Sequence, residues 1–219
     1  LRYAVPLIPN QICWWFNGIV GKYIVNFFIG GVANGILAVA TKFPNLVSTI
    51  MQIYFLAWTE NSIYEYNSKD KEKYFSKNLN GLLTFLLFCI SGLLLLIKIY
   101  FNVAIDDEYY SALYLIPILL FAMLFNSIAT FLGSIYTASK KTRDAFSTTI
   151  YAALTNVVLS FILISQIGII GYAISNLISY IVFAIIRYRS VNKICRIQIR
   201  IPHKLSLISV VIAIDIFFI

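Results

Sequence analysis

The sequence predicts an all-α fold, a polytopic bundle of transmembrane helices, and three observations lead to this class. Hydrophobic residues make up 60% of the 219 residues and charged residues 12%, against about half and a quarter in ordinary soluble domains. The apolar residues form long runs, each close to the roughly 20 residues that a transmembrane helix needs. These runs do not alternate between apolar and polar positions, as membrane β-barrel strands do. The composition therefore argues against a soluble globular enzyme.

Six apolar runs and the start of a seventh are expected to be helices. They cover residues 4–29, 32–57, 79–103, 111–137, 146–165, 169–186 and 205–219. The connections between them are Gly30-Gly31, the charged stretch 59–78, the acidic 106–108, the basic 139–144, the uncharged 166–168 and the basic 187–204. Because the sequence starts with Leu1 and stops inside an apolar run too short to cross a membrane, we expect it to be a piece of a longer protein.

The basic residues of the connections are confined to alternate connections. Fourteen fall on one side: Arg2, Lys69, Lys71, Lys73, Lys77, Lys140, Lys141, Arg143, Arg187, Arg189, Lys193, Arg196, Arg200 and Lys204. The opposite connections contain no Lys or Arg, and one of them contains Asp106-Asp107-Glu108. Because Lys and Arg accumulate in short cytoplasmic loops, residue 1 is expected to be cytoplasmic. This topology explains the net charge of +8 without a nucleic-acid partner.

Three further lysines, Lys22, Lys42 and Lys98, lie inside the apolar runs. A lysine at the centre of a span costs about 2.5–3.5 kcal/mol on insertion scales, so each needs a physical reason. Lys98 is near the outer end of its span, where its side chain can reach the headgroups. The other two continue polar stripes at helical spacing. Lys22 aligns with Gln11, Trp15, Gly18 and Asn26, and Lys42 aligns with Asn34, Ala38, Asn45, Thr49 and Gln52.

These two stripes predict a shared cationic cavity, with Lys22 and Lys42 as its substrate-binding residues. The polar residues expected to line it are Gln11, Asn26, Asn34, Asn45 and Gln52. No carboxylate in the first six runs neutralises the lysines, and Lys binds a phosphate or pyrophosphate as a point charge. Weaker stripes in the fourth and fifth runs are expected only to pack helices together. They comprise Asn126, Thr130, Ser134 and Thr137, and Thr148, Thr155, Asn156 and Ser160.

Catalytic and metal sites have little support, and we expect neither an enzyme nor a cofactor. His203 is the only histidine, so a Ser-His-Asp triad or a histidine metal site has no second member. Cys13, Cys89 and Cys195 have neither metal-ligand nor disulfide spacing. One alternative is that Asp106-Asp107-Glu108 holds a divalent metal for a polyprenyl-phosphate glycosyltransferase. Whether Asp215 serves as an intramembrane proton or ion site is left open.

The order of several short motifs resembles a known family over nearly the whole chain. The motifs are Tyr3-Ala4-Val5-Pro6-Leu7-Ile8-Pro9-Asn10, Gly21-Lys22-Tyr23-Ile24, Phe28-Ile29-Gly30, Ala33-Asn34-Gly35-Ile36-Leu37-Ala38-Val39-Ala40-Thr41-Lys42, Ala57-Trp58-Thr59-Glu60, Glu108-Tyr109, Ile116-Pro117-Ile118-Leu119 and Gly168-Ile169-Ile170-Gly171-Tyr172-Ala173. They resemble the polysaccharide biosynthesis flippases, the O-antigen and capsule repeat-unit translocases of the multidrug/oligosaccharidyl-lipid/polysaccharide exporter superfamily. The chain is similar to the second half of such a protein, from its seventh to its thirteenth span.

The resemblance implies one lobe, residues 1–219, of a two-lobed transporter in the bacterial cytoplasmic membrane. Such a transporter carries an undecaprenyl-pyrophosphate-linked oligosaccharide to the outer leaflet by alternating access, so the implied partners are that lipid, membrane lipids and the N-terminal half. Lys22 and Lys42 match family positions that are commonly basic, whereas Gly21 replaces a frequent acidic residue. Two alternatives stay open: a glycosyltransferase or polymerase acting on polyprenyl-linked sugars, and a cation-coupled drug exporter, which would need intramembrane carboxylates.

Overall fold

The computed structural model describes residues 19–105, 109–200 and 202–217, excluding the side chains of residues 98, 102, 104 and 217, and these ranges form a helical bundle without β-strands. The helices are Ile19–Phe28, α2 (Gly31–Glu65), α3 (Lys71–Ala104), α4 (Ala112–Ala138), α5 (Thr142–Ile167), α6 (Ile169–Val191) and α7 (His203–Phe217). The predicted all-α, polytopic class is confirmed. Five helices, α2 to α6, contain segments long and apolar enough to cross a membrane.

Helix α4 is the centre of the bundle. It contacts α2, α3, α5, α6 and α7, and its buried residues occur on all sides of the helix. A helix that is apolar all round belongs in a core. The outer helices instead expose large apolar side chains, such as Ile53 (72%), Phe88 (68%) and Val158 (56%). Patches of this kind on a helical bundle are suited to contact with lipid.

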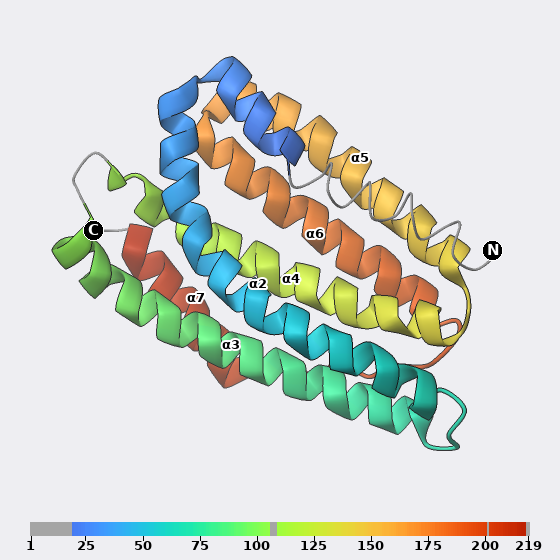
Figure 1. Ribbon diagram of the computed structural model, residues 1–219. Helices are drawn as coiled ribbons and strands as arrows, with labels where there is room; N and C mark the ends of the chain where they lie inside the picture. Colours follow the sequence, from blue (N-terminus) through green and yellow to red (C-terminus); the bar gives the residue numbers. More distant parts are fainter. Residues whose placement is uncertain (1–18, 106–108, 201, 218–219) are drawn as a thin grey trace.

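The connections lie alternately at the two ends of the bundle. The turn at Gly30, the junction of the end of α3 with the start of α4, and the turn at Gly168 lie at one end, in the upper left of Figure 1. The basic connections α2–α3, α4–α5 and α6–α7 lie at the other end. This geometry is the one that the charge pattern of the sequence predicts. Gly30 and Gly168 both have positive φ, 106° and 66°, so each turn uses a backbone conformation that glycine adopts readily.

Helix α2 is bent, and its two halves have different surroundings (Figure 1). Pro44 lies inside the helix on its buried face. A proline in a helix interior removes one backbone hydrogen bond and kinks the helix. After the bend, α2 runs beside α4, with Val47 and Met51 buried. The bend therefore separates an upper segment that contains Asn34 and Lys42 from a lower segment that packs along the core.

Several helices extend beyond their apolar runs at the basic end. The expected connection 59–78 shrinks to residues 66–70, because α2 continues to Glu65 and α3 begins at Lys71. Glu and Lys are good helix formers, so charge alone does not end a helix. Helix α6 also continues to Val191 and so contains Arg187, which the sequence analysis assigned to a basic connection. That assignment of Arg187 is wrong, because the residue is helical and 4% exposed.

Candidate functional site

The N-terminal helix Ile19–Phe28 packs on α6 at Gly21. A Cβ at Gly21 would lie 2.6 Å from Cε2 of Tyr172, and Val25, one turn further on, is fully buried. Residues four apart share a helix face, so Lys22 and Asn26 lie off this contact face, and both are exposed. The predicted pairing of Lys22 with Asn26 on one stripe is thus compatible with the way the helix is packed.

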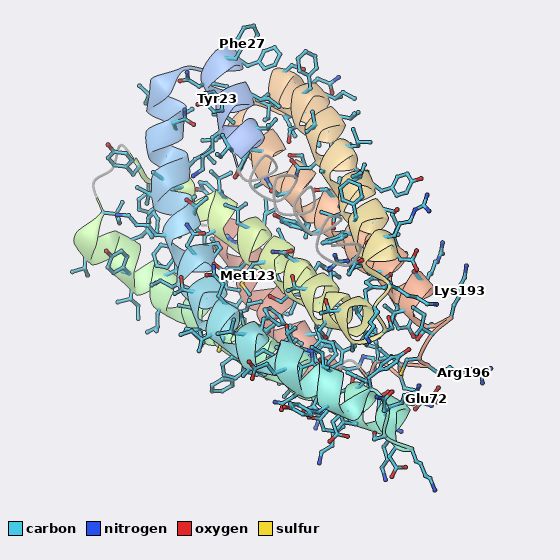
Figure 2. All side chains as sticks on the ribbon, turned by 45° about the vertical axis from the view of Figure 1, so that its right-hand side comes forward. Tyr23, Phe27, Glu72, Met123, Lys193 and Arg196 are labelled. Carbon is cyan, nitrogen blue, oxygen red and sulfur yellow. The ribbon has the colours of Figure 1, made fainter. Side chains whose placement is uncertain are left out.

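Asn26 also lines an open cavity of about 550 Å³ between this helix and α5. The rest of the lining is almost entirely apolar and includes Tyr23, Phe27 and Phe161. Figure 2 shows Tyr23 and Phe27 at the end of the bundle opposite Glu72 and Arg196. The predicted polar lining residue Asn26 therefore borders an apolar hollow at the end away from the basic connections.

The polar stripe of α2 faces away from the core. Lys42, Asn45 and Gln52 are exposed, whereas Leu37, Ala40, Val47 and Met51 are buried. Thr49 belongs to the same exposed stripe, and its hydroxyl donates a 2.8 Å hydrogen bond to the carbonyl of Asn45. An exposed polar stripe on a helix of transmembrane character must face water or another polar surface, because lipid gives it no partners.

Asn34 is placed differently from the rest of the α2 stripe. It is half-buried, and its Oδ1 is buried with no hydrogen-bond partner within the described residues. The Oδ1 of Asn126 in α4 is in the same situation. A buried acceptor without a partner costs about 1–3 kcal/mol. Both amides therefore have hydrogen-bonding capacity that the described part of the chain does not satisfy.

Neither lysine pairs with a carboxylate among the residues that the structure describes. Within the described residues, Lys22 and Lys42 make no ion pair or hydrogen bond. They lie on consecutive helices that are joined by the turn at Gly30. Gln11, Cys13 and Asp106-Asp107-Glu108 lie outside the described residues, as does the side chain of Lys98. No group of three or more His, Cys, Asp and Glu able to hold a metal occurs in the described ranges.

Several residues of the weaker polar stripes join helices, whereas Thr130 and Thr155 bond only within their own helices. Asn156 of α5 donates a 2.8 Å hydrogen bond to Ser179 of α6, and the hydroxyls of Ser160 and Ser175 are 2.9 Å apart. Between α2 and α4, Ser62 donates to Ser134 over 3.0 Å. Small and amide side chains of this type commonly join helices inside membranes. Ser134, Asn156 and Ser160 thus have their hydrogen-bond partners within the bundle, and we do not count them as candidates for binding a substrate.

Arg187 is the polar residue that the sequence analysis missed. Its guanidinium donates to the carbonyl of Ala129 in α4 (2.6 Å), to Thr148 (3.3 Å) and to Thr149 (3.2 Å) of α5. It also lies over the ring of Phe183, 4.2 Å from the ring centroid. A Cβ at Gly133 would collide with Nη1, so the glycine leaves room for the guanidinium. Arg187 thus joins α4, α5 and α6 through neutral partners.

One comparison with known proteins finds a match. The family model described as lipid II flippase MurJ matches residues 105–218, the region that contains α4 to α7. Lys22 and Lys42 lie outside the matched region. No curated protein and no solved structure shows significant similarity to the chain.

Proposed function

The chain belongs to the lipid II flippase MurJ family, and on this premise we propose that it forms one lobe of a transporter for polyprenyl-pyrophosphate-linked sugars. Proteins of this family are transporters of lipid-linked precursors and not enzymes. The chain is accordingly a multi-pass membrane protein. The proposed direction of transport is from the inner to the outer leaflet of the bacterial cytoplasmic membrane, with the basic connections on the cytoplasmic side.

The observation that carries this proposal is the exposed polar stripe of α2. Lys42, Asn45 and Gln52 lie on the helix face opposite the core contact. A lysine facing lipid near the middle of the membrane costs about 2.5–3.5 kcal/mol. A water-filled cavity between this lobe and a second lobe removes that cost. Lys22, exposed on the preceding helix, is proposed to add a second positive charge to this cavity, whereas Asn26 borders the apolar hollow against α5.

The chemistry of the stripe is suited to the head of a lipid-linked sugar. Lys22 and Lys42 attract the pyrophosphate as point charges, and neither is neutralised by a carboxylate within the described residues. The amides of Asn34, Asn45 and Gln52 donate and accept hydrogen bonds, as sugar hydroxyls require. The polyprenyl chain remains in the bilayer, in contact with the apolar outer surface.

Alternating access requires parts that move relative to one another. The break at Gly30 and the bend at Pro44 flank the segment of α2 that contains Asn34 and Lys42. Arg187, by contrast, ties α4, α5 and α6 into one unit. We therefore assign the movement to the N-terminal helix and the upper part of α2, against a rigid α4–α6 unit.

Two substrates share this chemistry. Lipid II is favoured by the family match, whereas an O-antigen or capsule repeat unit is favoured by the motifs of the first half of the chain, such as Gly21-Lys22-Tyr23-Ile24. Both have a pyrophosphate on a polyprenyl chain and differ in their sugars. The cationic site is therefore expected to serve either substrate, and the amide side chains are expected to discriminate between them.

The proposal is tested by transport in liposomes. The full-length protein is reconstituted, and the movement of lipid II and of a polyprenyl-pyrophosphate repeat unit between leaflets is followed separately. The Lys22→Gln/Lys42→Gln variant is expected to insert normally and to lose transport of both lipids. The matched control, Lys140→Gln/Lys141→Gln, removes the same charge from a basic connection and should retain transport.

Two results would refute the assignment. Unchanged transport by the Lys22→Gln/Lys42→Gln variant would show that the lysines do not bind the substrate. Sugar transfer or polymerisation without movement of the lipid would show that the protein is an enzyme acting on polyprenyl-linked sugars. In that case the substitution Asp106→Asn or Asp107→Asn should be the damaging one.

A further inference from the structure

A second hollow lies at the basic end of the bundle, and no residue of the α2 stripe lines it. It has a volume of about 970 Å³ and lies between the first turns of α3 and the segment that joins α6 to α7. Six basic residues line it: Lys69, Lys71, Lys73, Lys77, Arg196 and Arg200. Its acidic lining residues are Asp70 and Glu72. Figure 2 shows Glu72 and Arg196 at this end.

The wall opposite α3 is a short extended segment, residues 196–200, which we call the strap. Every second backbone N–H of the strap donates to a side chain of α3, at helix positions four residues apart. The three bonds join Arg196 N to Glu72 Oε1 (3.1 Å), Gln198 N to Ser76 Oγ (3.0 Å) and Arg200 N to Asn80 Oδ1 (2.6 Å). Eight helical residues rise about 12 Å, so the strap follows α3 over that length.

The strap has two different faces. Ile197 is buried (3% exposed), as is Cys195 just before the strap (1%), whereas Arg196, Gln198 and Arg200 are exposed and line the cavity. Because the backbone bonds fix the strap on α3, the two guanidinium groups are held on the cavity side. Glu72 is partly engaged, since its Oε1 accepts the N–H of Arg196. The unopposed charge of the cavity is therefore strongly positive.

The position of the cavity along α3 indicates which anion reaches it. Past Asn80, α3 becomes apolar, with Leu82, Leu83 and Leu86 buried, and α7 begins at His203 and packs on α3. The strap thus ends where the apolar parts of α3 and α7 begin. If the hydrocarbon core begins at these apolar parts, the cavity lies just outside it, at the depth of the lipid headgroups. Basic pockets between helices at this depth attract anionic lipid headgroups.

We propose that this cavity binds the phosphate-bearing headgroup of an anionic phospholipid, and that the bound lipid fastens the strap and α7 to α3. The headgroup phosphate contacts Arg196 and Arg200 from the strap and lysines from the first turns of α3. The inference does not rest on the transported substrate, because none of these residues belongs to the α2 stripe.

The test measures how much phosphatidylglycerol stays bound to the purified protein, with Lys140→Gln/Lys141→Gln as the control variant. The full-length protein is purified from membranes that contain phosphatidylglycerol and phosphatidylethanolamine, and bound phosphatidylglycerol is counted by native mass spectrometry. The variant Arg196→Gln/Arg200→Gln keeps the backbone bonds of the strap and removes two cavity charges. One basic residue near an anionic surface changes affinity roughly fivefold, so the double variant is expected to bind phosphatidylglycerol about thirtyfold more weakly.

The outcomes distinguish lipid binding in this cavity from a general effect of positive charge and from binding of a soluble phosphate compound. Lys140→Gln/Lys141→Gln should retain phosphatidylglycerol as the unaltered protein does; equal loss in both variants would overturn the proposal. Inorganic phosphate and glycerol phosphate at millimolar concentration should not displace the lipid. Displacement by either would show that the cavity takes a soluble phosphate compound instead.

Discussion

A Cβ at Gly21 would lie 2.6 Å from Cε2 of Tyr172, so the N-terminal helix meets α6 at a position that has no room for a side chain. This contact turns Lys22 away from the bundle. Gly21 is also the position at which the sequence resemblance led us to expect an acidic residue. A carboxylate at that position would be forced against a buried tyrosine ring.

The first prediction concerns this contact. Gly21→Ala is expected to weaken the packing of the N-terminal helix on α6 and to lower the midpoint of thermal unfolding, because the ring of Tyr172 must shift. Gly81→Ala is the matched control, since a Cβ at Gly81 meets nothing within 4 Å. That control should be neutral or gain up to about 1 kcal/mol from helix propensity. Equal midpoints for the two variants would contradict the close packing.

The second prediction concerns Arg187, whose guanidinium joins three helices. Arg187→Met removes the donors to Ala129, Thr148 and Thr149 while keeping an apolar chain of similar length. Hydrogen bonds to charged groups contribute about 1.5–3 kcal/mol each, so the free energy of unfolding is expected to fall by at least about 3 kcal/mol. Denaturant titration followed by circular dichroism measures this change.

The control for Arg187 lies two residues further along the same helix. Arg189 is exposed, and Arg189→Met should change the free energy of unfolding by less than about 0.5 kcal/mol. Arg187→Lys keeps the charge but has fewer hydrogen-bond donors. Its free energy of unfolding is expected to lie between those of the two Met variants. Equal stabilities for the Met variants at 187 and 189 would show that the guanidinium does not join the helices.

The third prediction uses Cys195 as a reporter of the strap. Burial, together with the nearby Glu72 carboxylate, raises the pKa of the Cys195 thiol above its ordinary value, while Lys71 opposes that shift. Because the thiolate is the reactive form, labelling by maleimide at neutral pH should be slow and should accelerate as the pH rises. Asn80 bonds the strap twice, donating to the carbonyl of Gln198 and accepting from the N–H of Arg200.

Removing that double contact should expose the thiol. Asn80→Ala is expected to label Cys195 several-fold faster at neutral pH than the unaltered protein, because the loosened strap restores hydration and a lower pKa. Asn78→Ala is the control, since its amide donates to the carbonyl of Tyr74 within the same helix. Equal labelling of the two variants, read by mass spectrometry, would show that the strap does not depend on Asn80.

The apolar runs were sufficient to predict an all-helical membrane fold, and the charge pattern predicted which connections share an end of the bundle. Hydropathy did not predict the helix ends, because helices continue through charged residues such as Glu65 and Lys71. It also placed Arg187 in a connection. Nothing in a linear pattern shows that Gly133 leaves space and that Thr148 and Thr149 supply partners.

The candidate site was predictable in part. Helical spacing placed Lys42, Asn45 and Gln52 on one face, and the structure puts that face opposite the core. Spacing did not show that Asn34 is half-buried or that Asn26 borders an apolar cavity, because both depend on neighbouring helices. The binding role of Lys22 and Lys42 stays a prediction. The strap was also unpredictable, since its bonds join residues more than a hundred positions apart in the sequence.

If the α2 stripe faces a water-filled cavity, its residues should differ in water exposure from their neighbours on α2. Asn45, Thr49 and Gln52 of the stripe are each followed by an exposed apolar residue at nearly the same depth: Leu46 (61% exposed), Ile50 (56%) and Ile53 (72%). Single cysteines are placed at these six positions in the full-length protein, with Cys13, Cys89 and Cys195 replaced by serine. Their reaction with a membrane-impermeant maleimide is then timed.

Thiolates form in water and not in lipid, so each stripe position is expected to react about tenfold or more faster than its apolar neighbour. This alternation along α2 would show a wet face and a lipid-facing side on the same helix. Slow reaction at Asn45→Cys, Thr49→Cys and Gln52→Cys, equal to that at Leu46→Cys, Ile50→Cys and Ile53→Cys, would place the stripe outside any aqueous cavity and contradict the account.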